Sequence, residues 1–301
     1  MRNKQKFSQK SLVNYFVKAC VLFLLLCMSS CAYRPKITIV QLPPEVEKII
    51  ITPEKNTIVP GERLSYAVDW HGIYAGEIIL LVKEIVKFND RECYHIIAQA
   101  HPTGLFRMFY NVKYFVETYI DKDLNRPLKF YKKKLFKKKV TEETINFDYH
   151  RNVAVWECTG KKSIEISLPK DAQDLLSSLY YFRLENLTLG QEYPINIVYN
   201  GKIWALNAKI DTLQMVKMHQ VANIKAFAVK LSSKLSEYIT GEEKIKIYFS
   251  MKSKHTPLFF NIRTKVGRLM GVLRDMPKEE TNEPNLCVSK ERRRRTHWVH
   301  H

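Results

Sequence analysis

The chain has 301 residues, of which 49 are Lys or Arg and 30 are Asp or Glu, so its formal net charge at neutral pH is +19. This length is sufficient for one large β domain, or two small ones, with a hydrophobic core. The basic excess predicts an anionic partner, and the six cysteines show no spacing typical of a metal-binding knuckle.

Residues 1–30 have the pattern of an export signal. Five basic residues and no acid precede an apolar run, Ala19–Met28. This run is too short to span a bilayer as a stable helix. Small Ser29 and Ser30 then precede Cys31, which resembles the lipobox of bacterial lipoproteins. The resemblance implies that Cys31 becomes the lipidated first residue. Secretion with cleavage near Ser30, or an uncleaved anchor, stays open.

Export changes the interpretation of the charge. Without residues 1–30 the chain keeps 44 basic and 30 acidic residues, a formal charge of +14. Outside the cytoplasm the nearest anionic surfaces are lipid headgroups, lipopolysaccharide phosphates and acidic glycans, so we expect no nucleic-acid partner. Ala32 follows Cys31 where an Asp would favour the inner membrane, so we expect a lipid-anchored protein of the outer membrane facing the periplasm.

Residues 31–60 are predicted to form an extended tether, because they are rich in Pro and lack Gly. The alternative is that Ile49–Ile51 adds an edge strand. Either leaves a β-rich domain over residues 61–275. Residues 276–301, with the Arg292–Arg295 run, have the composition of a disordered basic tail, which either binds an anionic surface or is solvated.

Period-two alternation of apolar residues predicts strands over most of residues 61–275. One segment, Asp171–Asn186, instead places Leu175, Leu176, Leu179 and Phe182 on one helical face, with Asp171 as its cap. A turn is predicted at Asn200–Gly201 and another at Thr240–Gly241. The predicted fold is mainly β, an antiparallel sheet curled into an open or half barrel, with one short helix between two strand sets. The first set comprises 64–69, 73–88, 93–100, 112–121, 127–139, 144–149 and 153–157, and the second comprises 193–199, 203–216, 224–231, 244–251, 257–264 and 269–274.

Several short motifs recur in an order that resembles an uncharacterised family of exported bacterial proteins, domain of unknown function 3108. They are Gly61–Glu77, Gly104–Val112, Tyr119–Asp121 with Pro127–Leu128, and Gln173–Arg183. The resemblance implies a β-rich exported domain and carries no agreed activity or catalytic residue. The architecture is also similar to that of lipoprotein-carrier proteins of the Gram-negative envelope, whose open half-barrel holds acyl chains.

The sequence contains no recognisable catalytic or cofactor motif. A nucleophile elbow, a His-Glu-x-x-His helix and a glycine-rich phosphate loop are all absent. Asp69 and His71 share a strand face, but Gly72 directly after them favours a tight turn over acid–base chemistry. We expect no enzyme activity, no cofactor and no metal. Cys93 and Cys158 either form a disulfide or stay as thiols.

The segment Gly104–Tyr110 is a candidate membrane or ligand loop. It carries an apolar cluster interrupted by Arg107: Leu105, Phe106, Met108 and Phe109. Exposed side chains of this kind enter a lipid leaflet or cover a lipid cavity. The alternative is a short helical turn that plugs the end of the barrel.

A second candidate segment, Lys132–Lys139, places lysines on both faces of a predicted strand. This pattern indicates an exposed edge or a protruding hairpin, where lysines commonly prevent edge-to-edge aggregation. The alternative is that the lysines bind anionic lipid headgroups. The candidate contacts are Lys132, Lys134, Lys137 and Lys139.

Two functional hypotheses follow, with a cryptic hydrolase as a third. In the first, a lipid or glycolipid occupies a cavity in the open barrel, lined by apolar residues such as Trp70, Ile79, Phe115, Trp204 and Phe227. In the second, the core is packed and a tethered interaction module acts through its surface. The sequence leaves the ligand, the partner proteins and the oligomeric state open.

Overall fold

The computed structural model describes residues 37–42, 49–54, 57–104, 106–211, 213–218, 223–232, 245–252, 254–264 and 267–275. The side chains of Phe109 and Thr264 lie outside this description. The chain divides into two units, residues 1–34 and 35–301, and every described residue belongs to the second. The predicted signal, Cys31, Leu105, the Thr240–Gly241 turn and the basic tail therefore lie outside the described residues.

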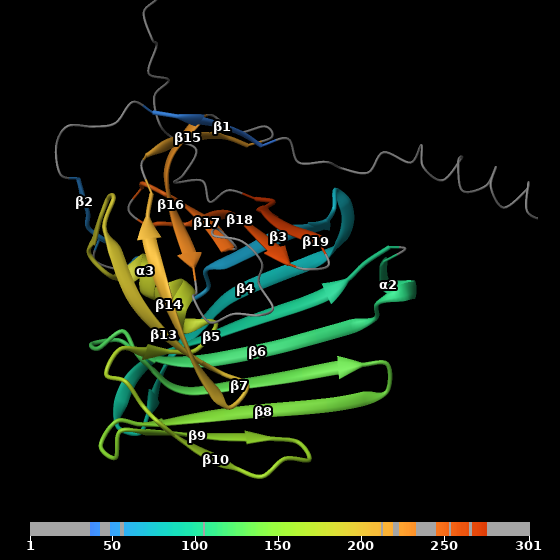
Figure 1. Cartoon of the computed structure of the whole chain (residues 1–301), viewed down its shortest axis with the longest axis vertical. Helices are drawn as coiled ribbons and strands as arrows, with labels where there is room; N and C mark the ends of the chain where they lie inside the picture. Colours follow the sequence, from blue (N-terminus) through green and yellow to red (C-terminus); the bar gives the residue numbers. More distant parts are fainter. Residues whose placement is uncertain are drawn as a thin grey trace, which may run out of the picture. The chain divides into compact units, whose positions relative to one another are not determined.

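Within the described residues the secondary structure is almost entirely β (Figure 1). The strands are β1 (Thr38–Gln41), β2 (Ile50–Ile51), β3 (Arg63–Trp70), β4 (Ile73–Phe88), β5 (Arg91–Pro102), β6 (Val112–Asp121), β7 (Pro127–Phe136), β8 (Lys139–Asp148), β9 (Val153–Cys158), β10 (Ile164–Ser167), β11 (Ala172–Gln173), β12 (Leu187–Thr188), β13 (Glu192–Tyr199), β14 (Lys202–Ile210), β15 (Gln214–Lys217), β16 (Asn223–Ser232), β17 (Ile245–Ser250), β18 (Pro257–Thr264) and β19 (Gly267–Leu273). The helices are α2 (Phe106–Phe109) and α3 (Ser177–Leu184).

Seventeen of these strands form one curled sheet, and β2 pairs with β12 in a separate two-stranded sheet. From β16 the ladder runs through β17, β18 and β19 to β3, and from there in chain order to β10. Among the described pairings only β11 with β13 is parallel. The prediction of a mainly antiparallel, curled sheet is confirmed.

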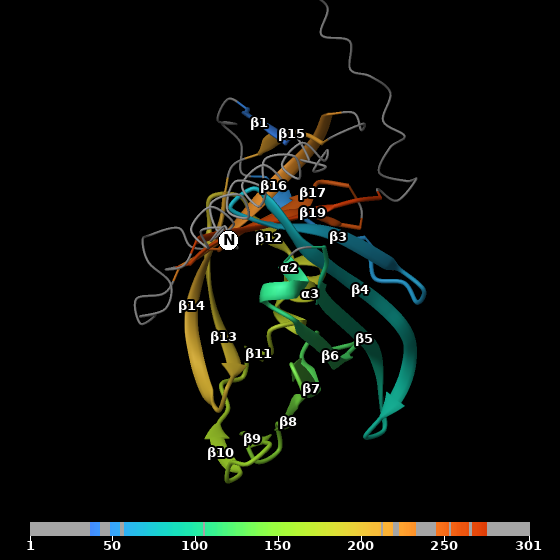
Figure 2. The ribbon, with the colours of Figure 1, turned by 90° about the vertical axis from the view of Figure 1, so that its right-hand side faces the viewer.

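Side chains close the gap between β13 and the strands β7–β9. A Cβ atom on Gly201, in the β13–β14 turn, would lie 3.1 Å from the Trp156 ring, so glycine permits this approach. The Asn200 backbone N–H donates to Glu143 at 3.0 Å. Figure 2 shows β13 and β14 facing β4, β5 and β6 across the interior. The sheet is therefore barrel-like, and side-chain contacts, including a buried cluster of Val198 with Phe130 and Trp156, bring β13 against β7–β9.

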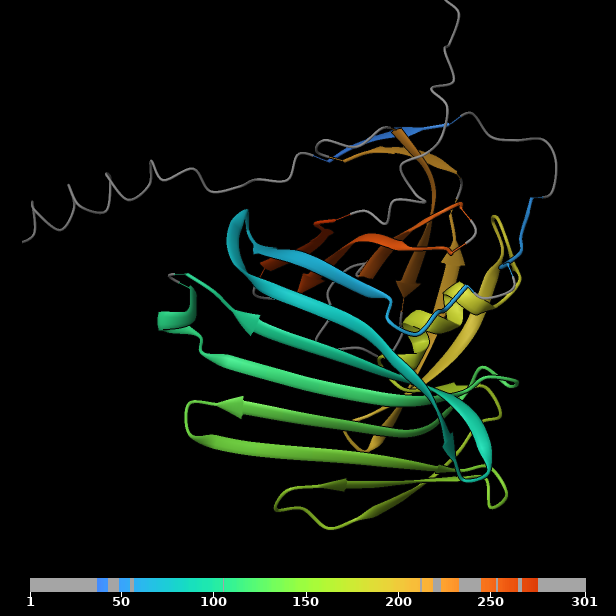
Figure 3. The same ribbon diagram turned by 180° about the vertical axis from the view of Figure 1, so that it is seen from behind.

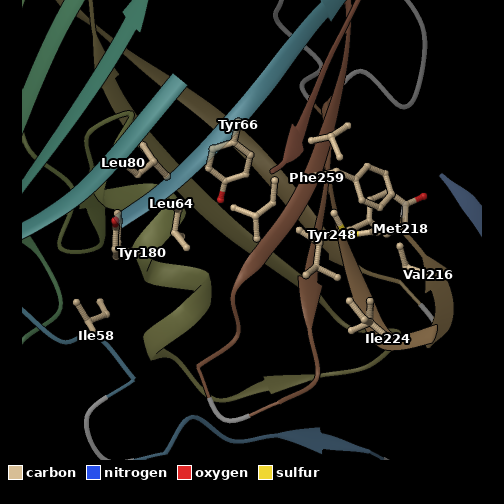
Figure 4. Packing of buried hydrophobic residues seen from close by; sticks show 14 of the residues in the cluster. Ile58, Leu64, Tyr66, Leu80, Tyr180, Val216, Met218, Ile224, Tyr248 and Phe259 are labelled. Atoms are coloured by element: carbon tan, nitrogen blue, oxygen red, sulfur yellow. The ribbon is translucent and has the colours of Figure 1, made fainter. Parts of the chain in front are cut away.

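Apolar residues from alternate strand positions fill one part of the interior. The largest core cluster joins β3, β4, β16, β17 and β18 to α3, and Figure 4 shows fourteen of its members. In this cluster Tyr248 stacks on Phe259 with ring centroids 4.0 Å apart, and the Tyr66 hydroxyl donates to the Pro257 carbonyl at 2.8 Å. Burial of this apolar surface supplies the main driving force for folding.

The helix α3 is shorter than predicted, and Asp174 rather than Asp171 caps it. The Asp174 carboxylate accepts the backbone N–H groups of Leu176 and Ser177 at 2.7 and 2.8 Å, and the Thr118 hydroxyl at 2.6 Å. Asp171 instead accepts a hydrogen bond from Asn196 at 3.3 Å. Sequence spacing alone does not show which of two nearby acids binds the start of the helix. The structure shows that it is Asp174, which Thr118 on β6 also contacts.

A buried ion pair fastens α3 to the sheet. Arg183, whose side chain is fully buried, donates to both Glu62 carboxylate oxygens, at 2.8 and 3.1 Å. It also donates to the carbonyls of Thr57 and Lys254. Arg183 thus joins α3 to the segment before β3 and to the β17–β18 turn, which lie together in Figure 3.

Two strand predictions need correction. The segment expected to be a tether contains β1, which pairs with β15, so the paired part of the chain begins at Thr38 rather than Gly61. The predicted alternative of a strand at Ile49–Ile51 is confirmed by β2, which pairs with β12. The lysine strand β7 lies between β6 and β8 and is not a sheet edge. Lysines on both faces are tolerated there because their ammonium groups meet carboxylates or reach solvent, as shown below.

Replacing Glu62 by Gln tests the role of the buried pair. Loss of the carboxylate leaves the buried guanidinium without its counter-charge, so we expect the free energy of unfolding to fall by about 3 kcal/mol. The matched control is Glu165→Gln, whose partner Arg151 lies at the same 2.8 Å distance but is well exposed, and this change should be nearly neutral. Equal losses in urea unfolding would contradict the account.

The raised pKa of Asp174 predicts that the stability of the fold depends on pH. Burial raises its pKa from 3.8 to about 6, so the folded state binds the proton more tightly than the unfolded chain between these values. Its contribution to stability is therefore complete below about pH 4 and is lost as the pH rises through about 6. Relative to an Asp174→Asn variant, the wild type should lose about 3 kcal/mol between about pH 4 and 7. A difference that stays constant with pH would contradict this.

Candidate ligand-binding cavity

A cavity of about 770 Å³ lies between α3 and the concave face of the sheet. Its walls come from β3 and β4, from β13 and β14, and from β16, β17 and β18. The lining residues are Tyr66, Ile78, Leu80, Leu175, Ser178, Leu179, Phe182, Ile197, Tyr199, Asn200, Lys202, Trp204, Leu206, Leu231, Ile245, Ile247, Pro257, Phe259, Phe260 and Ile262. Most are apolar, so the cavity favours an apolar occupant.

The strand register explains which predicted residues line this cavity and which do not. On β4, Ile78 faces the cavity, so its neighbour Ile79 faces the other side of the sheet. The same register pairs Ile79 with Gln99 and Gln99 with Phe115, which places Phe115 on that outer face too. Of the five residues predicted to line a cavity, Trp204 does so. The prediction that Ile79 and Phe115 line the cavity is wrong, because both side chains lie on the opposite face of the sheet.

The other two predicted lining residues have different surroundings. Phe227 is fully buried and stacks on Phe249 with centroids 5.3 Å apart, so it belongs to the packed core. Trp70 lies at the end of β3, where its ring packs edge-to-face with the Phe106 ring, with the ring centroids 5.7 Å apart. A sequence pattern marks both as inward-facing aromatics, but it does not show where the core ends and the cavity begins.

One end of the cavity is polar. Lys132, predicted as a headgroup contact, forms an ion pair with Glu143 and donates to the Asn200 side chain at 3.3 Å. Its ammonium also lies 4.3 Å from the centre of the Tyr199 ring. Glu143 is buried and accepts the Trp156 indole N–H at 2.8 Å. Lys132 therefore compensates a buried carboxylate beside the cavity residues Tyr199 and Asn200.

Lys134 lies two residues along the same face of β7, near Tyr114. Its ammonium is 5.7 Å from the centre of the Tyr114 ring. Burial raises the pKa of Tyr114 above its ordinary value, and Tyr199 adds to the rise while Lys132 opposes it. Two lysine–tyrosine contacts, Lys132 with Tyr199 and Lys134 with Tyr114, therefore lie on the concave face.

Lys137 and Lys139 occupy the β7–β8 turn and are exposed. Lys137 has a positive φ of 55°, as the tight turn requires, and its backbone N–H contacts the Asn111 carbonyl at 3.5 Å. On the outer face Lys133 pairs with Glu142 at 3.0 Å. The four predicted headgroup lysines are therefore divided between the concave face and the turn.

The candidate loop forms a single helical turn, α2 (Figure 2). Met108 is 77% exposed, whereas Phe106 is half-buried against Trp70 and Tyr110. The backbone is a short helical turn, as the predicted alternative has it. The side chain of Met108 is exposed, as the membrane-loop hypothesis requires. Nothing can be said of Leu105 or the Phe109 side chain, which lie outside the described residues.

The remaining candidate groups do not form a reactive centre. The Asp69 carboxylate accepts the Gly72 backbone N–H at 3.1 Å, and His71 has a φ of 53°, as expected for a tight turn. Cys93 and Cys158 are unpaired thiols, and burial raises the pKa of Cys93 to about 11. Within the described ranges no three His, Cys, Asp or Glu side chains are grouped to hold a metal ion, and no helix is long and apolar enough to cross a membrane.

Comparison with known proteins gives a structural neighbour and a family, both of unknown function. A crystal structure of a β-barrel-like protein of domain of unknown function DUF1849 from Brucella abortus is similar to this chain, with a TM-score of 0.48 and 10% sequence identity. The similarity covers 71% of this chain and 95% of the other. No curated protein matches the chain.

The family resemblance carried by the short motifs is confirmed over most of the sheet. The model of the DUF3108 family, described as a protein of unknown function, matches residues 65–274, from β3 to the end of β19. The chain belongs to the DUF3108 family.

Proposed function

We propose that this protein is an exported, lipid-anchored envelope protein that binds an amphiphilic lipid or glycolipid in the cavity beside α3. The cavity of about 770 Å³ carries the proposal. It lies within the range of about 300–1,000 Å³ that is typical of small-molecule sites. Its apolar walls favour hydrocarbon, because burial of apolar surface is favourable without any directional contact.

The polar end of the cavity favours an amphiphile over a purely apolar ligand. Tyr199, Asn200 and Lys202 lie together at the β13–β14 turn, and Lys202 is exposed. A ligand whose chain packs along Leu179 and Leu206 can place its head group at this turn. Lys132 and Glu143 already neutralise each other there, so the exposed Lys202 is the cation that best suits an acidic head group.

The cavity also supports a non-catalytic role. Among the described residues its polar lining consists of Ser178, Asn200, Lys202, the Trp204 indole and the tyrosine hydroxyls, without a carboxylate or histidine. Histidine and carboxylates are the commonest general acids and bases, so Lys202 and the tyrosines are the titratable groups that remain for such chemistry. Export and the anchor at Cys31 rest on the signal pattern of residues 1–31.

Two neighbouring residues of β4 provide a matched test. Ile78→Trp places an indole in the cavity, whereas Ile79→Trp places the same group on the outer face. With dansyl-undecanoic acid as the fluorescent probe, we expect Ile78→Trp to weaken binding at least about tenfold, because the indole occupies ligand space. Ile79→Trp should bind as the wild type does.

Thermal unfolding of both variants controls for damage to the fold. Equal weakening by the two substitutions, or saturable binding that Ile78→Trp leaves unchanged, would show that the probe binds elsewhere. Absence of saturable binding by the wild type would contradict the proposed function.

A further inference from the structure

Three connections meet at one end of the sheet, on the right of Figure 1. They are the β3–β4 turn, the β5–β6 connection with α2, and the β7–β8 turn. Rings link them in series: Trp70 to Phe106 at 5.7 Å, Phe106 to Tyr110 at 6.0 Å, and Tyr110 to Phe136 at 6.2 Å. We call this surface, residues 70–76, 106–116 and 132–141, the basic rim.

The basic rim combines exposed apolar side chains with a one-sided charge. Ile73 is 61% exposed and Met108 77%, and Tyr110, Phe136 and Val140 are also exposed. The three segments contain Arg107 and seven lysines but no Asp or Glu. Because Lys132 and Lys133 pair with Glu143 and Glu142 just outside the segments, the charge of the rim is carried mainly by Arg107, Lys113 and the exposed lysines of the β7–β8 turn. Exposed apolar groups of this size, interspersed with cations, mark an interaction surface rather than an ordinary solvated edge.

A pocket of about 510 Å³ adjoins α2 on the outer side of the rim. Its lining includes His101, Arg107, Lys113 and Lys133, next to Phe115 and Leu135. His101 lies 3.5 Å from Glu77 and Lys133 pairs with Glu142, so Arg107 and Lys113 are the cations that best suit an anion. Arg107 and Lys113 are exposed and belong to segments without acids. Cations around a partly apolar pocket suit a phosphate that is attached to hydrocarbon.

We propose that the basic rim docks on a bilayer that contains anionic phospholipid. The apolar tips would enter the interface while the lysines contact phosphates, as in other interfacial segments with aromatic and basic residues. A second copy of the chain is a poor occupant, because two basic rims would repel each other. The proposal does not depend on occupancy of the cavity, since no residue that lines the cavity belongs to the rim, although Lys132 of the rim lies beside its polar end.

Docking at the rim would also orient the cavity. The helix α3 lies at the opposite end of the sheet, where the Asn125 side chain of the β6–β7 turn donates to Glu185 at 3.0 Å. The cavity extends from Phe182 of α3 to Ile262 of β18. Gly267, which pairs with the end of β18, lies against His71 in the β3–β4 turn. The Ile262 side of the cavity therefore approaches the rim.

The test uses unlipidated chains of residues 32–301 and sedimentation with two kinds of vesicle: phosphatidylcholine alone, or with about 30% phosphatidylglycerol. The wild type should bind only the anionic vesicles, and more weakly as NaCl rises from about 50 to 500 mM. A triple variant, Lys137→Glu, Lys138→Glu and Lys139→Glu, should bind about a hundredfold more weakly. The matched control reverses three cations at the opposite end: Lys87→Glu, Arg151→Glu and Lys170→Glu.

A depth measurement distinguishes docking of the rim from diffuse attraction. In otherwise unchanged chains, Met108→Trp adds an indole to the rim, and Leu124→Trp adds one to the exposed β6–β7 turn at the other end. Brominated lipids should quench the added emission of the first and not of the second. Equal quenching, equal losses in both triple variants, or no preference for anionic vesicles would overturn the proposal. Circular dichroism of each variant excludes unfolding as the cause.

Discussion

The ion pair between Arg183 and Glu62 is the contact on which the arrangement of the cavity depends. A sheet that curls around its own concave face exposes that face unless another element covers it, and α3 covers only part of it. The guanidinium fixes α3 to the segment before β3 and to the β17–β18 turn, with its charge compensated in a fully buried position. Such a pair costs desolvation energy, and its value lies in specifying one position for the helix rather than in net stabilisation. The position that results leaves Leu175, Leu179 and Phe182 facing a space that side chains do not fill.

This incomplete filling is the reason that we propose the ligand hypothesis rather than the packed interaction module. A packed interaction module would continue the tightly packed rings of Tyr248, Phe259, Phe227 and Phe249 across the whole interior. Instead, the described core is divided into clusters: the largest joins β3, β4, β16, β17 and β18 to α3, and a second packs β13, β14 and β16 against Phe182 of α3. Members of both clusters line the unfilled cavity. Lys132 and Glu143 join the β13–β14 turn to β7 and β8 through side chains. A buried apolar cluster that includes Phe130, Trp156 and Val198 packs the same strands together, so the closure combines polar and apolar contacts.

Much of the sheet follows from the sequence, because alternation of apolar residues specifies both the strands and their two faces. Short elements such as β1 and β10 carry too few alternating positions to be recognised, and the partner of β1 is distant in sequence. The cavity is harder to predict, since a strand pattern gives two faces without saying which is concave; Ile79 and Phe115 were assigned to the wrong one for this reason. The lysines of β7 likewise needed the register with Glu142 and Glu143 before their separate roles could be seen. Asp174 and Arg183, which position α3, carry no local sequence signal, because their partners lie on β6, before β3 and in the β17–β18 turn.

The central claim is that the cavity holds an amphiphile, and native mass spectrometry tests it most directly. Residues 32–301 would be exported to the periplasm of a bacterial host behind a cleavable signal, purified without detergent, and measured intact and after lipid extraction. The account predicts a protein mass increased by one lipid or glycolipid, with the same lipid recovered in the extract. A mass equal to that of the chain alone, with no lipid in the extract, would contradict it.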